Sequence, residues 1–222
     1  MDSFLDVLAR CPLFHGSGAE EIESMLRCLT AKRRAFPAKA VIFEAGTETF
    51  ELGVVLSGTV DIIQEDFWGN PGMLARLLPG QVFAESFVLA HTHRLPVSVI
   101  ASQASQVILL DYRRILHTCT NACPHHARLI SNLLTLIAQK NAYLTQKMEI
   151  ITRKTIREKL LAFLSMESKR ASSRSFTIPY DRQALADYLA VDRSALSRAL
   201  GEMAREGLLS FRKNAFELNT TE

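Results

Sequence analysis

The sequence is poor in several features that would assign a protein to a specialised class. Its 222 residues include only four cysteines, at irregular spacing, which are too few for the disulfide framework of a small secreted protein. No stretch approaches the roughly 18 consecutive apolar residues of a membrane-spanning helix. The N-terminus begins MDSFLDVLARCPLF, without the basic segment of a secretory signal. We therefore expect a cytoplasmic protein with reduced thiols that does not act at a membrane.

The sequence also lacks the usual marks of an enzyme. It contains no glycine-rich loop that could cradle a phosphate, and no recognisable set of nucleophile, base and orienting group. An enzyme using His125 with Cys123 or Asp111 is the competing hypothesis. We expect that the protein is not an enzyme.

Net charge is small but unevenly placed. Residues 151–222 carry 13 Lys and Arg against 9 Asp and Glu, whereas residues 1–150 carry 13 against 14. A basic excess attracts the phosphates of nucleic acid. The length favours two domains, and the charge distribution favours a C-terminal one as the DNA-binding part.

The segment Arg182–Leu200, RQALADYLAVDRSALSRAL, is typical of two short helices joined by a tight turn. Asp192 is a good N-cap for the second helix, because its carboxylate can accept from unpaired backbone N–H groups. The four polar residues that follow share one face of that helix, where a recognition helix contacts base edges. The alternative is an ordinary amphipathic pair with solvated arginines. These four residues are Arg193, Ser194, Ser197 and Arg198.

The N-terminal half contains short apolar runs separated by turn residues, which predicts an all-β roll. The predicted strands are 41–43, 52–56, 60–63, 73–78, 97–101 and 106–110.

No glycine or proline interrupts the segment from about Pro124 to Ile151, which predicts one helix of about 42 Å. Its apolar residues recur in steps of three and four, as in a coiled-coil seam, with Asn141 at a position where a polar residue fixes two-strandedness. We expect a parallel homodimer, although packing within one domain is the alternative, and a hinge at Thr152–Thr155. The predicted interface comprises Ile130, Leu134, Ile137, Asn141, Leu144, Met148 and Ile151.

This order of parts resembles the cAMP receptor protein / fumarate–nitrate regulator (Crp/Fnr) superfamily of bacterial transcription regulators. The resemblance covers nearly the whole chain and is most specific in the last of four segments: VLSGTV at 55–60, GQVFAES at 80–86, RQALADYL at 182–189 and DRSALSR at 192–198. It implies an α+β fold with a cyclic-nucleotide-binding-like β-roll effector domain (1–123), a dimerisation helix (124–151) and a winged helix-turn-helix DNA-binding domain (152–222).

The resemblance also implies how DNA is contacted. Members of the family contact DNA from the positions of Arg193, Ser194, Ser197 and Arg198, and a homodimer would bind a palindromic operator of double-stranded DNA. The family's usual glutamate is absent at Ser194, so we expect a different target sequence. RNA polymerase would be a further partner of an activator. Arg182 and the basic wing residues Arg212 and Lys213 complete the candidate DNA-binding set.

The predicted effector site departs from the family. The family's glutamate matches Glu85, but its preceding glycine is Ala84, and gapless counting places Leu95 where the family's phosphate-binding arginine would stand. Arg94 is one residue away, which on a strand turns a side chain to the opposite face. We therefore expect an unidentified small-molecule effector other than cAMP. Its candidate contacts are Glu85, Ser86, Arg94 and Thr145.

Two alternatives remain for regulation. The first is an effector-independent DNA-binding regulator in which the roll only supports dimerisation. The second is a redox or metal sensor that uses Cys119 and Cys123, although we favour buried thiols as the explanation of this pair. His91 and His93 are weak candidates for haem ligands. We predict neither a metal nor haem as a cofactor.

Overall fold

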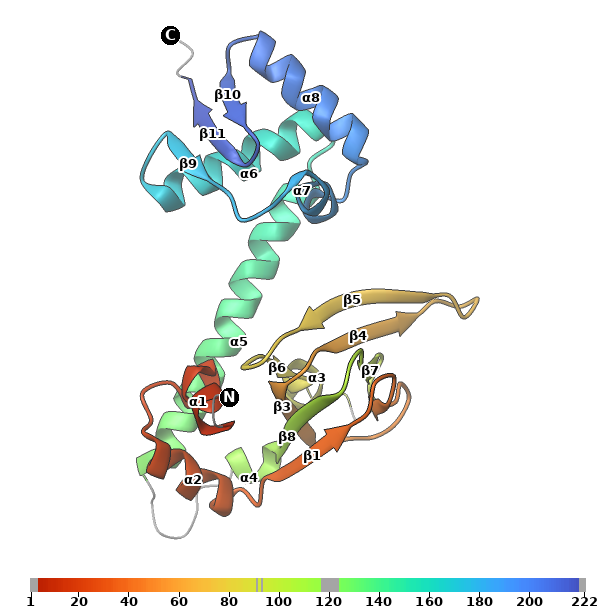
Figure 1. Ribbon diagram of the computed structural model, residues 1–222, viewed down its shortest axis with the longest axis vertical. Helices are drawn as coiled ribbons and strands as arrows, with labels where there is room; N and C mark the ends of the chain where they lie inside the picture. Colours follow the sequence, from red (N-terminus) through yellow and green to blue (C-terminus); the bar gives the residue numbers. More distant parts are fainter. Residues whose placement is uncertain (1–3, 91, 93, 117–123, 220–222) are drawn as a thin grey trace. The chain divides into compact units, whose positions relative to one another are not determined.

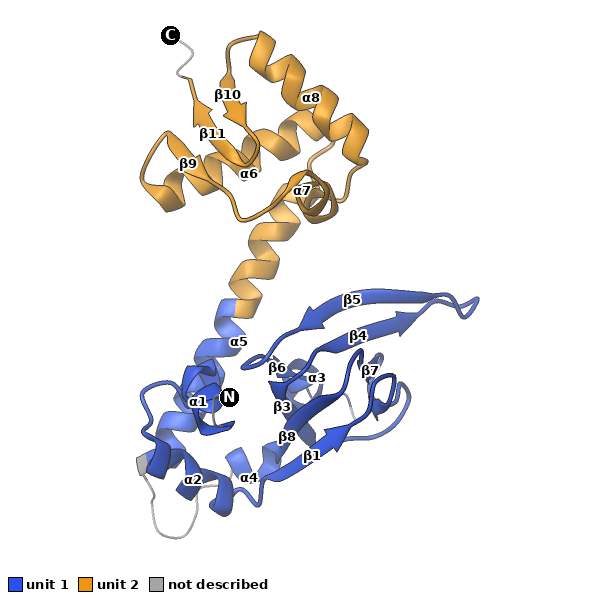
Figure 2. Ribbon diagram, in the orientation of Figure 1, with its two compact units in different colours: residues 1–139 blue, residues 140–222 orange. Residues whose placement is uncertain are grey.

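A computed structural model describes residues 4–90, 92, 94–116 and 124–219 (Figure 1). The chain divides into two compact units, residues 1–139 and 140–222 (Figure 2). The boundary between them falls inside one 28-residue helix, α5 (Pro124–Ile151). The first unit contains the predicted β-roll and the second contains the predicted winged helix-turn-helix, which confirms the α+β fold.

The roll is built from two antiparallel four-stranded sheets, with strand orders β1-β8-β3-β6 and β2-β7-β4-β5. The strands are β1 (Lys32–Phe36), β2 (Val41–Phe43), β3 (Glu51–Ser57), β4 (Val60–Glu65), β5 (Pro71–Leu77), β6 (Val82–Phe83), β7 (Ser98–Ala101) and β8 (Ser105–Asp111). The helices of this unit are α1 (Phe4–Arg10), the short 3-10 turn Pro12–Phe14, α2 (Ala19–Cys28), α3 (Glu85–Leu89) and α4 (Tyr112–Leu116), in addition to the first half of α5.

The first sheet has a hydrophobic core on each of its faces. Val55, Val107 and Leu109 pack with residues of the second sheet, inside the roll. The intervening residues, such as Val54 and Ile108, pack with α1, α2 and α5. Because successive side chains of a strand point to opposite faces, one run of apolar residues supplies both cores.

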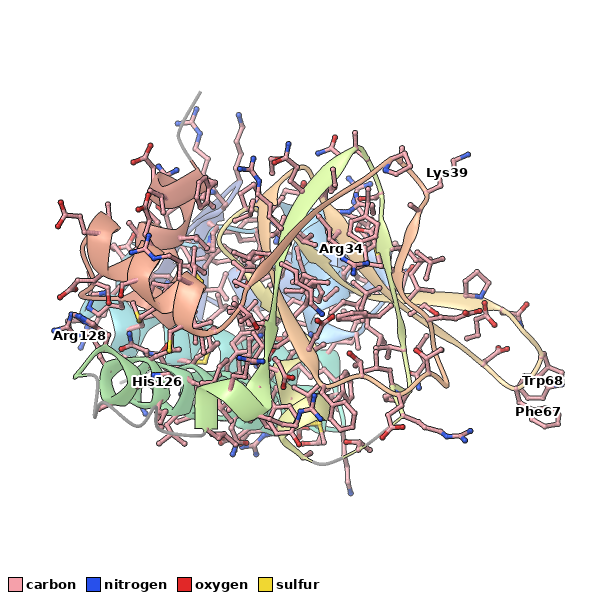
Figure 3. The ribbon with its side chains drawn as sticks, turned by 90° about the horizontal axis from the view of Figure 1, so that it is seen from below. Arg34, Lys39, Phe67, Trp68, His126 and Arg128 are labelled. Atoms are coloured by element: carbon pink, nitrogen blue, oxygen red, sulfur yellow. The ribbon has the colours of Figure 1, made fainter. Side chains whose placement is uncertain are left out.

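The hairpin formed by β4 and β5 extends from the roll and carries two exposed aromatic rings, Phe67 and Trp68, at its tip (Figure 3). Its turn is closed by Asp66, whose carboxylate accepts from the backbone N–H groups of Trp68 and Asn70, at 2.9 Å each. Hydrogen bonds from the side chain and backbone of Asn70 lower the pKa of Asp66. The polar turn thus explains why a hairpin forms here although its tip is not packed.

The first half of α5 is held on the roll unit by polar side chains as well as by the core. Arg128 Nη1 donates to Gly16 O and to Glu21 Oε2, both at 2.8 Å. The ring of buried His126 hydrogen-bonds Arg114 O through Nε2 at 2.9 Å. Leu129, Leu133 and Leu136 are buried in the core that also contains α1 and α2.

The second unit has its own core and a three-stranded sheet of order β10-β11-β9. Its further elements are α6 (Ile156–Ala171), β9 (Ser175–Thr177), α7 (Arg182–Leu189), α8 (Arg193–Arg205), β10 (Leu209–Arg212) and β11 (Ala215–Leu218). Helices α7 and α8 with the β10–β11 hairpin form the predicted winged helix-turn-helix.

Candidate nucleic-acid interface and effector site

Helix α8 begins where the sequence predicts. Asp192 is its N-cap, and its carboxylate accepts from Ala195 N at 2.9 Å. Ser194 Oγ donates to the same carboxylate. These hydrogen bonds, that of Ser194 first, lower the pKa of Asp192, so the cap stays ionised at neutral pH.

One face of α8 is buried and the other is free to meet a ligand. Leu196, Leu200 and Met203 lie in the core of the unit, which fixes the rotation of the helix about its axis. All four predicted base-reading residues are exposed, in the first two turns of the helix. Within the described part of the chain neither Arg193 nor Arg198 forms a salt bridge, so both guanidinium groups can pair with DNA.

The turn between α7 and α8 depends on a left-handed residue. Ala190 has φ 51° and ψ 58° and is exposed, and its N–H donates to the last carbonyls of α7. The next residue, Val191, donates to Ala186 O at 3.0 Å. Since Leu185 and Leu189 are fully buried, the turn and the core together set the angle between the two helices.

The wing places two cations beside the helix pair. Arg212 and Lys213 are exposed at the tip of the β10–β11 hairpin, and Asn214 Nδ2 anchors the tip by donating to Ile178 O at 3.0 Å. Arg182 is different, because its guanidinium lies over the ring of Phe211 and Nη2 donates to Lys213 O at 3.3 Å. Burial lowers the pKa of Arg182. This residue therefore supports the tip of the wing, a structural role that the sequence did not suggest.

The predicted effector residues of the roll lie in contrasting environments. Glu85 is 3% exposed at the start of α3, and Ser86 Oγ donates to its Oε1 at 3.1 Å. The preceding Ala84 has φ 64°, the left-handed conformation that favours glycine. Glu85 is thus a buried carboxylate, held by Ser86 and preceded by a left-handed turn residue.

The position counted for the family's phosphate-binding arginine holds no cation. Leu95, at the position counted for the arginine, is 1% exposed and packs in the core of the roll. Arg94 is exposed, and its backbone pairs with that of Glu48. A hollow of about 480 Å³ on the β4–β5 hairpin is lined by residues 64–66, 70–72 and 74, and it includes none of the predicted effector residues.

The structure says less about the other predicted effector and sensor residues. Thr145 is exposed on the part of α5 that belongs to the second unit. Cys119, Cys123, His91 and His93 lie outside the described residues. Among the residues that the structure describes, no three His, Cys, Asp or Glu side chains gather as metal ligands, and no helix is long and apolar enough to cross a membrane.

Each half of the chain matches a known domain family. Residues 33–121 match the cyclic nucleotide-binding domain, and residues 158–221 match the Crp-like helix-turn-helix domain. The cyclic AMP receptor protein of Thermus thermophilus is 26% identical over 201 residues, which are 89% of this chain and 88% of the relative. The anaerobic regulatory protein of Pasteurella multocida is 22% identical and is aligned with 85% of this chain and 68% of its own length.

Solved structures show the same fold. The c-di-GMP responsive global regulator CLP of Xanthomonas campestris superposes with a TM-score of 0.55 at 21% identity, covering 92% of this chain and all of the other. The catabolite activator protein of Thermus thermophilus gives 0.50 at 24% identity, with 94% and 93% covered.

These matches decide the class of the protein. A cyclic nucleotide-binding domain implies a small-molecule effector, and a Crp-like helix-turn-helix implies DNA binding. Crp-like regulators are DNA-binding transcription factors and not enzymes, which confirms the expectation that this protein has no catalytic role. With both domains present in the family's order, the chain belongs to the Crp/Fnr superfamily of transcription regulators.

Proposed function

We propose that the protein is a homodimeric regulator that binds a palindromic operator and responds to a small molecule other than cAMP. The observation that carries the proposal is the exposed polar face at the start of α8, with Arg193 and Arg198 free of salt bridges within the described residues. An arginine in this position can donate two hydrogen bonds to guanine in the major groove. Arg212 and Lys213 would contact phosphates, which strengthen binding without reading sequence.

The case for a homodimer rests on the face of α5 that a single chain leaves uncovered. Leu134, Leu144 and Met148 are 64%, 57% and 57% exposed. They lie in the predicted seam with exposed Asn141, whereas Leu129, Leu133 and Leu136 on another face are buried within the chain. A second copy of α5 would cover the seam and give the two-fold symmetry that a palindrome requires. Sedimentation as a dimer would support this arrangement, and a monomer would contradict it.

The roll lacks a positive charge at the position where the family binds the cyclic phosphate of cAMP. A cyclic phosphate needs a cation, and the arginine position holds Leu95, buried in the apolar core of the roll. Pro96 also removes a backbone N–H that could bind a phosphate. Glu85 remains and favours a ligand with hydroxyl or amine donors. We expect no heat of binding when cAMP is added in calorimetry, and saturable binding would refute this part of the proposal.

The DNA-reading role is tested by Arg193→Ala, with Arg205→Ala as the matched control. Arg205 is an exposed arginine in the last turn of the same helix, outside the predicted reading face. The operator is first selected from random duplexes, and affinity is then measured by fluorescence anisotropy at fixed salt. Loss of a bidentate contact should weaken operator binding by about 5- to 150-fold, with little change on unrelated DNA. Equal losses on both duplexes, or an equal effect of Arg205→Ala, would refute base reading by Arg193.

The effector is tested by native mass spectrometry of the protein purified without oxygen. A dimer with bound metabolite supports a ligand-responsive regulator. A dimer that carries zinc, iron or haem would instead support the sensor hypothesis for Cys119 and Cys123. A dimer whose operator affinity is unchanged by metabolites, metals and oxygen would establish effector-independent regulation.

A further inference from the structure

Residues 156–219 are called the reading head below. The segment that connects helix α5 to this head is well ordered by hydrogen bonds. The four residues 152–155 link α5 to α6, and all four backbone N–H groups donate hydrogen bonds. Their acceptors are, in order, Met148 O at 3.0 Å, Ile150 O at 3.3 Å and, for the last two, Glu158 Oε2 at 3.1 Å each. Thr155 also caps α6, with its hydroxyl accepting from Glu158 N at 3.1 Å. The first two hydrogen bonds lie at the end of α5 and the last two within the cap of α6, so the four residues are ordered, and the packing of α5 on the head decides whether they can act as a hinge.

The last turns of α5 are also packed on the reading head. The ring of Tyr143 lies 6.4 Å from that of Tyr188 on α7, at an interplanar angle of 62°. Lys147 Nζ lies 5.2 Å from the centre of the same ring, within the range of a cation–π contact. Ile150 is buried in the core of the head. Three residues spaced as i, i+4 and i+7 thus form one docking face on α5.

Tyr188 receives this face because it is itself held firmly. Its ring lies 5.3 Å from the rings of both Phe163 and Tyr180, which come from α6 and from the segment before α7. Burial, with smaller effects from Tyr143 and Tyr180, raises the pKa of Tyr188 to about 12. The Tyr188 side chain is therefore a fixed, neutral platform at the centre of an aromatic cluster.

The docking face and the predicted dimer seam are different faces of α5. At about 100° per residue, the face of Tyr143, Lys147 and Ile150 lies roughly a third of a turn from that of Asn141, Leu144 and Met148. One helix can therefore contact a second copy on one side and its own reading head on the other. Neither contact has to be broken for the other to form.

We propose that Tyr143 and Lys147 are positioning residues that fasten the last three or so turns of α5 to α7, so that the head turns with the dimer helix. The consequence for regulation rests on the proposed function, but the joint itself does not. The last turns of α5, residues 140–151, then move with the head as one body, and the head does not swing at Thr152–Thr155. Rotation of the two copies of α5 in the proposed dimer would therefore turn the base-reading face of α8 by the same amount, because no loose linker lies between them.

The joint is tested by amide hydrogen exchange on the full-length protein, with no DNA present. Tyr143→Ala removes the ring contact, Tyr143→Phe keeps it, and Gln146→Ala changes an exposed neighbour outside the docking face. For Tyr143→Ala we expect roughly 2- to 12-fold faster exchange in residues 143–155 and in α7, as for loss of one aromatic pair. The other two variants should match the native protein, and the roll should not change.

Three results would overturn the joint. They are fast exchange of residues 152–155 in the native protein, no greater effect of Tyr143→Ala than of Gln146→Ala, and equal effects of the alanine and phenylalanine variants. Operator affinity is measured separately. If the joint also positions the head on DNA, Tyr143→Ala weakens operator binding while binding to unrelated DNA and dimerisation persist. Failure of Arg193→Ala to affect operator binding would refute the proposed function and leave the exchange result standing.

Discussion

Replacing Ala190 by glycine should stabilise the reading head. Ala190 has φ 51° and ψ 58°, a conformation that costs a residue with a Cβ about 1–2 kcal/mol. Its side chain is exposed, so its removal sacrifices no packing, and its N–H still donates to Ala186 O and Asp187 O. Glycine loses about 0.5–1 kcal/mol more chain entropy on folding. At the midpoints of these two ranges, the net gain expected for Ala190→Gly is about 0.8 kcal/mol.

The gain is measured by native-state hydrogen exchange of the slowest amides of α7 and α8, which does not require the whole chain to unfold in one step. Those amides should exchange about 2- to 5-fold more slowly. Gly201→Ala is the matched reverse substitution, because Gly201 lies within α8 and a Cβ added there meets nothing within 4 Å. It should stabilise the head by about 1 kcal/mol. Faster exchange in Ala190→Gly would refute the argument from backbone conformation.

Two further predictions concern the roll and the aromatic cluster. Gly53→Ala would place a Cβ 2.0 Å from Phe83 Cζ, and this overpacking should lower the free energy of unfolding by about 1–3 kcal/mol, whereas Gly72→Ala, whose added Cβ would meet only Gln64 O at 3.5 Å, should change little in a urea titration. Because the pKa of Tyr188 is raised to about 12 and an unfolded phenol ionises near 10, the contribution of Tyr188 to the free energy of unfolding should be constant below pH 10 and fall between pH 10 and 12, by on the order of 2 kcal/mol relative to Tyr188→Phe. The same fall in Tyr188→Phe would refute this assignment.

The strands of the roll could be predicted where apolar residues alternate and turns interrupt them, but β1 could not. Its sequence, Lys32–Phe36, is basic, and four of its five residues are exposed. It becomes a strand because β8 supplies a complete row of backbone partners from Lys32 to Phe36. Pairing at a sheet edge does not require an apolar pattern, so a sequence analysis based on periodicity misses it.

The helix-turn-helix could be predicted almost completely, because local features specify it. The Asp192 cap, the small residues at the turn and the apolar positions of α8 all lie within twenty residues. The packing of Arg182 on Phe211 could not be predicted, since the two residues are 29 positions apart and meet only when the wing folds against α7. An exposed arginine and an arginine that supports a wing have the same sequence signature.

The partner of each face of α5 is harder still to predict from the sequence, because the helix is apolar on more than one side. Steps of three and four predict a seam with Leu134, Leu144 and Met148, which are exposed, yet Leu129, Leu133 and Leu136 follow a similar spacing and are buried within the chain. Tyr143, Lys147 and Ile150 continue the face of these three leucines along the helix, about 40° from it, and contact the reading head instead of the roll. Periodicity shows that a helix has partners, but only the fold shows which partner each face contacts.

The roll shows how a pocket can keep its backbone while its chemistry changes. Ala84 adopts the left-handed conformation at the position where the family's glycine stands, and Glu85 remains buried directly after it. The strain of about 1 kcal/mol at Ala84 is tolerated, which indicates that the surrounding fold dictates this turn. Leu95, in contrast, takes the place of a charge with a core side chain. The retained turn and the missing cation are the basis of our proposal of an effector other than cAMP, and a neutral or cationic metabolite is the class with which a screen should begin.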